Sequence, residues 1–228
     1  MDDDVVEFVC HPDILGDIPE PMPASRVLPF WYESLDMVVD CGEFTDRTVR
    51  ACPSFLDALS LGWIVPFDRD IEVLTTESGV DFSDGVTNFM VGSDNLPDDV
   101  VASVTFESRW SVIVPDGYSL LITTPMNRSE RRFRVVSRLL DADNTVTQLD
   151  VPVFWTAGDA NTIIKRGSPM CQVIPLCRES RIDRASVEPL GPRGEEVLHH
   201  VRKRTKVDNS WYRTKEWSPK ATRVLQDT

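Results

Sequence analysis

The sequence is poor in lysine and in long apolar runs. Only 5 of its 24 basic residues are lysine, whereas 24 of its 37 acidic residues are aspartate. No run of 18 apolar residues occurs, which excludes a transmembrane helix by the usual length criterion. The N-terminal Met1-Asp2-Asp3-Asp4 lacks the basic and then apolar layout of a signal peptide. We therefore expect no membrane partner and no secretion by a signal peptide.

The chain also lacks the residue spacings of common cofactor and metal sites. It has five cysteines but no Cys-x-x-Cys pair, and its three histidines, His11, His199 and His200, show no zinc-site spacing with the cysteines. There is no phosphate-cradling Gly-rich loop and no Ser-His-Asp set. We expect no metal site and no resident cofactor, and we interpret the cysteines as mostly buried small apolar residues rather than disulfide partners.

The charge is unevenly distributed along the chain. Residues 1–180 have a net charge of -17, whereas residues 181–228 have a net charge of +4. Aspartate-rich, lysine-poor surfaces are typical of halophile proteins, although an ordinary acidic protein is the alternative. A basic segment is able to bind nucleic acid, but counterion release favours that binding least at high salt. We therefore expect no nucleic-acid partner and favour docking of this segment on the acidic flank of a neighbouring subunit.

Composition and turn signals divide the chain into three segments. Residues 1–44 are rich in proline and are expected to form an extended arm. Residues 45–180 are predicted to form a β domain with one short helix, which begins at Pro53 and ends before Gly62, and with a loop insertion at 77–100. Residues 181–228 are predicted to be a basic arm with a short helix at 195–204. Three aromatic anchors follow in this arm: Trp211, Tyr212 and Trp217.

Short alternating segments predict an antiparallel, mainly β domain. Turns every 8–12 residues favour a barrel or a sandwich. The signal Pro115-Asp116-Gly117 predicts a hairpin between 110–114 and 118–123, and Gly167 predicts a turn with positive φ. The other expected strands are 63–66, 70–74, 101–106, 133–140, 147–155, 162–164 and 170–174.

Three consecutive segments resemble motifs of dUTPases and dCTP deaminases. Residues 115–125 resemble the strand that leads to the second motif, 137–143 resemble the third motif, and 164–174 resemble the fourth. The resemblance spans residues 112–176 and implies a dUTPase-like β-clip fold, a distorted antiparallel barrel that commonly forms homotrimers. The segments 52–58 and 62–66 are also similar to uncharacterised proteins of tailed viruses and bacteria.

The resemblance also implies candidate site residues. Asp141 and Gln172 are the catalytic candidates, and Arg128 joins them as a nucleotide- or anion-binding candidate; a hydrolase of this type would use Mg²⁺. Asn144 stands where the family has a tyrosine that stacks on the sugar, and the first and fifth motifs are not recognisable. Four nearby arginines either grip an anion or pair with acidic side chains: Arg128, Arg131, Arg132 and Arg134.

These observations predict that the chain keeps the dUTPase-like fold but has lost the catalytic activity of that family. We expect a non-catalytic virion structural protein, a capsid decoration or cement protein of a halophilic archaeal tailed virus, present in the virion or the host cytoplasm. Its expected partners are copies of itself, as a homotrimer, and other virion proteins. The alternatives are a divergent dUTPase or dCTP deaminase-type hydrolase and a nucleotide-binding regulator without turnover.

Overall fold

The structure is a computed structural model that describes residues 5–76, 79–88, 96–158, 161–207 and 212–218. Its residues form two compact units, which are described separately below. Unit 1 comprises the described residues of 5–27 and 59–181, and unit 2 comprises those of 28–58 and 182–218. These units divide the chain differently from the three predicted segments, because each unit combines residues from distant parts of the sequence.

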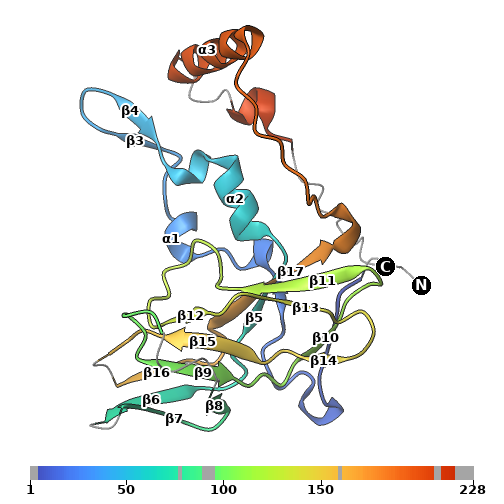
Figure 1. Ribbon diagram of the computed structural model, residues 1–228. Helices are drawn as coiled ribbons and strands as arrows, with labels where there is room; N and C mark the ends of the chain where they lie inside the picture. The colour runs from blue at the N-terminus through green and yellow to red at the C-terminus, as the bar shows by residue number, and fades with distance from the viewer. Residues whose placement is uncertain (1–4, 77–78, 89–95, 159–160, 208–211, 219–228) are drawn as a thin grey trace. The chain divides into compact units, whose positions relative to one another are not determined.

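Unit 1 is built on a five-stranded antiparallel sheet that contains the longest strand of the described chain (Figure 1). β17 pairs with β11 on one side and β5 on the other, so its side chains are buried over most of its length. The strands, in spatial order, are β13 (Arg138–Leu140), β11 (Tyr118–Thr123), β17 (Pro169–Cys177), β5 (Trp63–Pro66) and β2 (Met22–Pro23).

Three further antiparallel sheets complete the strands of unit 1. A four-stranded sheet has the order β12 (Phe133–Val135), β15 (Val151–Trp155), β9 (Ala102–Phe106), β8 (Val86–Asn88). The two three-stranded sheets have the orders β1 (Glu7–Val9), β10 (Ser111–Ile113), β14 (Thr147–Gln148) and β16 (Thr162–Ile164), β6 (Ile71–Thr76), β7 (Gly79–Phe82). In the described part of the chain none of these sheets closes into a barrel, so the mainly β class is confirmed but the predicted barrel is not.

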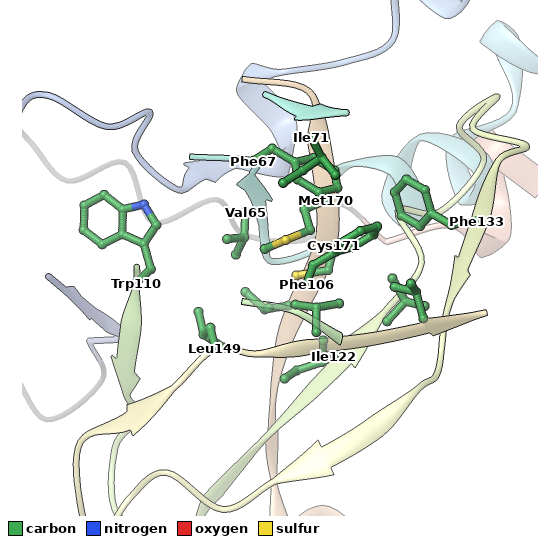
Figure 2. Close-up of a cluster of buried hydrophobic side chains, with 14 of the residues drawn as sticks. Val65, Phe67, Ile71, Phe106, Trp110, Ile122, Phe133, Leu149, Met170 and Cys171 are labelled. Carbon is green, nitrogen blue, oxygen red and sulfur yellow. The ribbon is translucent and has the colours of Figure 1, made fainter. Parts of the chain in front are cut away.

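The core of unit 1 is aromatic as well as aliphatic. Phe106 packs edge-on against Phe67 and Phe133, with ring centroids 5.0 and 5.3 Å apart. Trp155, which is fully buried, stacks on Phe133 and donates its indole hydrogen bond to Ala157 O. Each such ring pair adds about 0.5–1.5 kcal/mol to the free energy gained by burial. Figure 2 shows part of this core, including Phe106, Phe133 and Cys171.

Unit 2 contains most of the helices and an isolated β hairpin. The hairpin joins β3 (Val38–Asp40) to β4 (Thr45–Arg47). The helices are α1 (Phe30–Glu33), α2 (Pro53–Ser60), whose last two residues belong to unit 1, and α3 (Pro192–Val207). Single turns complete both units: η1 (Pro12–Ile14), η2 (Ala24–Arg26), η3 (Val49–Ala51), η5 (Arg178–Ser180) and the π-helical η6 (Tyr212–Glu216).

Local signals in the sequence predicted several elements correctly. β5, β11 and β16 have the predicted bounds, α2 begins at Pro53, and the predicted C-terminal helix lies within α3. Gly62, with φ +68°, follows the end of α2, and Gly167, with φ +85°, occupies a turn. These features depend on backbone preferences of a few neighbouring residues, which the sequence displays directly.

Four sequence predictions were wrong. β10 pairs with β1 and β14, so it forms no hairpin with β11. The single strands predicted at 133–140 and 147–155 are each two strands in different sheets. The loop predicted at 77–100 contains β7 and β8, although 77–78 and 89–95 lie outside the described residues. Of the five free cysteines only Cys171 is buried.

The first part of the predicted proline-rich arm belongs to the body of unit 1. β1 pairs with β10, β2 pairs with β5, and Ile18 is buried in the core. The Trp110 indole donates a hydrogen bond of 3.0 Å to Pro19 O. Because proline has no backbone N–H, these residues make few backbone hydrogen bonds and form only short strands and turns. Neighbouring side chains hold them in place.

Candidate functional site

Asp141 belongs to a charged network at one end of β11. Ser119 Oγ donates a hydrogen bond of 2.6 Å to Asp141 Oδ1, and Arg178 Nη1 lies 3.7 Å from the same oxygen. Arg178 Nη2 also pairs with Asp143 Oδ2, which accepts a hydrogen bond from the Gly117 N–H. The Asp141 side chain nevertheless remains 69% exposed, whereas that of Asp143 is 5% exposed. Asp143 therefore has the structural role in this network, and Asp141 keeps an accessible carboxylate.

We expect the Asp143–Arg178 pair to make folding sensitive to acid. The hydrogen bond from Arg178 holds the pKa of Asp143 below its ordinary value of 3.8. A carboxylate with a depressed pKa in the folded state stabilises folding above its ordinary pKa, and that contribution is lost as the pH falls through the folded-state pKa. Asp143→Asn is expected to lose less of its free energy of unfolding between pH 6 and pH 3 than the wild-type protein, as measured by urea unfolding. Asp116→Asn, at an exposed turn residue, is the control and should behave as wild type; an equal pH dependence for Asp143→Asn and wild type would contradict the assignment.

Gln172 is fully buried and clamps two backbone segments together. Its Oε1 accepts a hydrogen bond of 2.8 Å from the Met126 N–H, and its Nε2 donates one of 2.6 Å to Leu61 O. A backbone N–H only donates and a carbonyl only accepts, so these two partners fix the orientation of the amide. Gln172 therefore has a structural role in this chain, and its amide is directed at protein backbone.

Arg128 is half-buried and is also engaged by the fold. Its Nη2 donates a hydrogen bond of 2.5 Å to Val27 O. Its Nε is buried without a hydrogen-bond partner among the described residues, and burial lowers the pKa of the guanidinium. The preceding Asn127 has φ +55°, the one positive φ of a non-glycine residue in the described chain, so a tight turn delivers Arg128 to this position.

The fold does not bring the three predicted residues together within one copy of the chain. Ser119, which binds Asp141, and Thr123, which lies opposite Gln172, are four residues apart on β11. At the rise of an extended strand this separation is about 13 Å. Arg128 follows Met126, the partner of Gln172, and so lies on the Gln172 side. A role of these residues on a nucleotide stays a prediction.

The other arginines of the predicted cluster are mostly paired with acidic side chains. Arg132 forms a two-point ion pair with Glu130, with N···O distances of 2.9 and 2.7 Å. Arg134 lies 2.8 Å from Asp99 and over the ring of Phe154. Arg131 is exposed and has no ion pair among the described residues. The alternative of pairing within the chain therefore holds for Arg132 and Arg134.

A surface pocket of about 320 Å³ lies elsewhere in unit 1. The pocket contains none of the three predicted residues. Of its two arginines, Arg69 is neutralised by Asp68, since Arg69 Nε donates a hydrogen bond of 2.7 Å to Asp68 Oδ1. Its lining residues are His11, Ile14, Arg69, Glu107, Ser108, Arg109, Ser111 and Gln148.

In the part of the chain that the structure describes, no three His, Cys, Asp or Glu side chains are grouped to hold a metal ion. None of the described helices combines the length and apolar character needed to cross a bilayer.

Unit 2 presents a hairpin from a well-packed base. Tyr32 stacks on Phe55 with ring centroids 5.8 Å apart, and Trp31 packs edge-on against the same ring. Arg50 Nη1 donates hydrogen bonds of 2.7 Å to Glu33 O and Leu35 O. These contacts fix both strands at their base, while every residue of β3 and β4 is exposed. A two-stranded hairpin is only marginally stable in water by itself, so the contacts at its base hold it in a defined conformation.

Large apolar side chains are exposed across unit 2. Every residue from Ile182 to Arg193 is exposed, and in this stretch Val187 is 99% and Ile182 is 87% exposed. Sequence reasoning missed this surface, although apolar residues interleaved with acids at 33–46 were a visible signal. The other large apolar residues of the unit with the greatest exposure are Phe30, Met37, Val38, Phe44, Leu190 and Val197.

The predicted aromatic anchors are only partly described. Trp217 Nε1 donates a hydrogen bond of 2.8 Å to Asp57 Oδ2, and both residues belong to unit 2. Tyr212 is 42% exposed, and Trp211 lies outside the described residues. Trp217 therefore ties the C-terminal segment to the 28–58 segment.

Neither a family model nor a curated protein matches the sequence. The likeness to dUTPases consequently depends on the three motif segments at 115–125, 137–143 and 164–174.

Proposed function

We propose that the protein is a non-catalytic structural protein that assembles with copies of itself and with other proteins of a virus particle. The observation that supports this most directly is the surface of unit 2. Monomeric proteins seldom expose many large apolar side chains on one compact unit, and such surfaces usually mark protein interfaces. A hairpin held at its base and a fully exposed 182–193 segment are suited to reach a neighbouring subunit.

The engagement of the candidate site residues also favours a structural role. Gln172 and Arg128 hydrogen-bond backbone carbonyls, and Gln172 additionally accepts from a backbone N–H. A metal-assisted hydrolase needs its carboxylate and cationic groups to converge on the phosphates. In this chain Asp141 and Gln172 are associated with opposite ends of β11.

The resemblance and the composition support a more specific proposal for the oligomer, the role in the virion and the host. The motif segments favour a dUTPase-like β-clip fold and a homotrimer, and threefold symmetry suits a capsid decoration or cement protein. The aspartate-rich, lysine-poor composition favours a virus of a halophilic archaeon, and the tailed-virus proteins with similar segments favour a tailed one.

Quantitative mass spectrometry of purified particles tests this proposal. We expect the protein in a fixed ratio to the major capsid protein, because a decoration or cement protein occupies repeated positions. A chain found in infected cells but absent from purified particles would remove the proposal. A trace amount that varies between preparations would remove it equally.

A divergent dUTPase or dCTP deaminase-type hydrolase is the second candidate, because the exposed Asp141 carboxylate lies beside the Arg178 guanidinium. Incubation with dUTP and dCTP in high salt with Mg²⁺ is expected to release no pyrophosphate and no ammonia. Turnover that Asp141→Asn abolishes and the exposed control Asp116→Asn retains would replace the structural proposal with the enzymatic one.

A further inference from the structure

The hairpin of unit 2 has one predominantly apolar face. Side chains alternate along a strand, and Val39 pairs with Asp46. Met37 and Phe44, directly outside the paired residues, continue the Val39 face; they are 49% and 62% exposed, and Val39 is 38% exposed. Val38, with 50% of its surface exposed, lies on the opposite face with Arg47.

The same segment is mostly acidic, and the basic residue of β4, Arg47, lies on the Val38 face. Residues 33–46 contain five carboxylates, from Glu33 to Asp46, and no basic residue. The Glu43 and Asp36 side chains have no ion pair among the described residues. Asp46, opposite Val39, puts a carboxylate on the apolar face itself, and Asp36 and Glu43 add negative charge next to Met37 and Phe44 in the sequence.

α3 has the complementary character. Its sequence contains five basic residues, including Arg193 and Lys203, and two acidic ones. Val197 is 58% and Leu198 is 37% exposed, and Leu190, directly before the helix, is 53% exposed. The helix therefore combines exposed apolar side chains with a net positive charge.

We propose that the Met37–Val39–Phe44 face of the hairpin is the docking site for α3 of a second copy of this chain. The inference rests on the proposed assembly function and names the two surfaces that would meet. Apolar side chains supply the buried contact, and opposite charge at its border fixes the partner and disfavours hairpin-to-hairpin and helix-to-helix pairing. Each copy has both surfaces, so the contact forms a pair or a ring, including a ring of three, where the rotation between copies closes, and an open chain where it does not.

Charge reversal in the full chain tests the pairing. Sedimentation equilibrium measures the average mass of each variant as a function of concentration, which gives the dissociation constant of self-association. Asp36→Lys with Glu43→Lys on the hairpin, or Arg193→Glu with Lys203→Glu on α3, is expected to weaken self-association about tenfold. Combining all four substitutions in one chain is expected to return the dissociation constant to within about threefold of wild type. Failure of the combined variant to recover would overturn the inference.

Substitutions on the two faces of the hairpin test the apolar half of the contact. Val39→Ser with Phe44→Ser is expected to weaken self-association about tenfold or more, whereas Val38→Ser, on the opposite face, is expected to change it less than about twofold. Circular dichroism melting of each variant checks that the change is in association and not in folding. Equal effects from both faces would overturn the inference.

The remaining outcomes separate this inference from the proposed function. Self-association that none of the substitutions changes overturns the inference and leaves the assembly function standing. A full chain that remains monomeric at every concentration, with hairpin variants that only lower the melting temperature, also overturns it, since α3 would then act on its own hairpin. Mass spectrometry of particles decides the proposed function independently.

Discussion

The Gln172→Leu variant will unfold at a much lower denaturant concentration than the wild-type protein. Leucine fills similar space but leaves the Met126 N–H and the Leu61 carbonyl, both directed at position 172, without their hydrogen bonds. A backbone group left unpaired in the interior costs about 1–3 kcal/mol. Both hydrogen bonds are partly buried, so we expect a loss of about 2–4 kcal/mol in the free energy of unfolding after a small apolar gain. Urea unfolding followed by circular dichroism measures it.

The matched control is the same substitution at Gln148. That side chain donates to Ser108 O and Asp150 Oδ1 but is exposed, so water replaces its partners and the loss is expected to be below about 1 kcal/mol. Equal stability of the two variants would show that Gln172 is not a clamp. A Gln172→Leu protein that is stable but loses nucleotide turnover would instead favour the enzyme alternative.

Replacement of Gly62 with alanine will destabilise unit 1 even more. Gly62 has φ +68°, and a Cβ built there lies 2.1 Å from the carbonyl oxygen of Val173, a backbone atom of the central strand β17. The left-handed conformation costs an L residue about 1–2 kcal/mol. Moving a strand to relieve the clash costs about 1–3 kcal/mol more, so we expect a total loss of about 2–5 kcal/mol.

Gly167→Ala separates the two causes. Gly167 has φ +85°, but a Cβ there meets no atom within 4 Å. This variant is therefore expected to lose only the conformational part, about 1–2 kcal/mol. Similar losses for both alanine variants in thermal unfolding would mean that β17 moves freely away from position 62, against the packing described.

Elements whose determinants are local were accessible from the sequence. The start of α2 at Pro53, the positive φ of Gly167 and the bounds of β11 and β16 follow from the preferences of a few adjacent residues. The mainly β class follows from the repeated short alternating segments in the same way.

Strand partners were not accessible, because distant residues determine them. Val112 pairs with Phe8, more than a hundred residues earlier, and not with the strand after the Pro115-Asp116-Gly117 turn. The turn forms, since the Tyr118 N–H donates to Pro115 O, but the chain then enters a different sheet. Continuous apolar patterns likewise concealed the sheet changes within 133–140 and 147–155.

For the candidate site, the sequence showed residue types but not their hydrogen bonds. Gln172 matches a motif glutamine, yet its burial and its two backbone partners appear only when β17 lies between β5 and β11. The acidic partners of Arg132 and Arg134 are two and thirty-five residues away, so the sequence left anion binding and internal pairing equally open.

The central position of β17 has a consequence for synthesis of the chain on the ribosome. β5 and β11 each leave the ribosome before β17, and they present open edges until residues 169–177 arrive between them. At about 10 residues per second, the stretch from the end of β11 to the end of β17 takes on the order of 5 s to translate. During that interval the nascent chain exposes unpaired, apolar strands, which are prone to aggregate. A chaperone that covers them is therefore expected to matter most at this stage of synthesis.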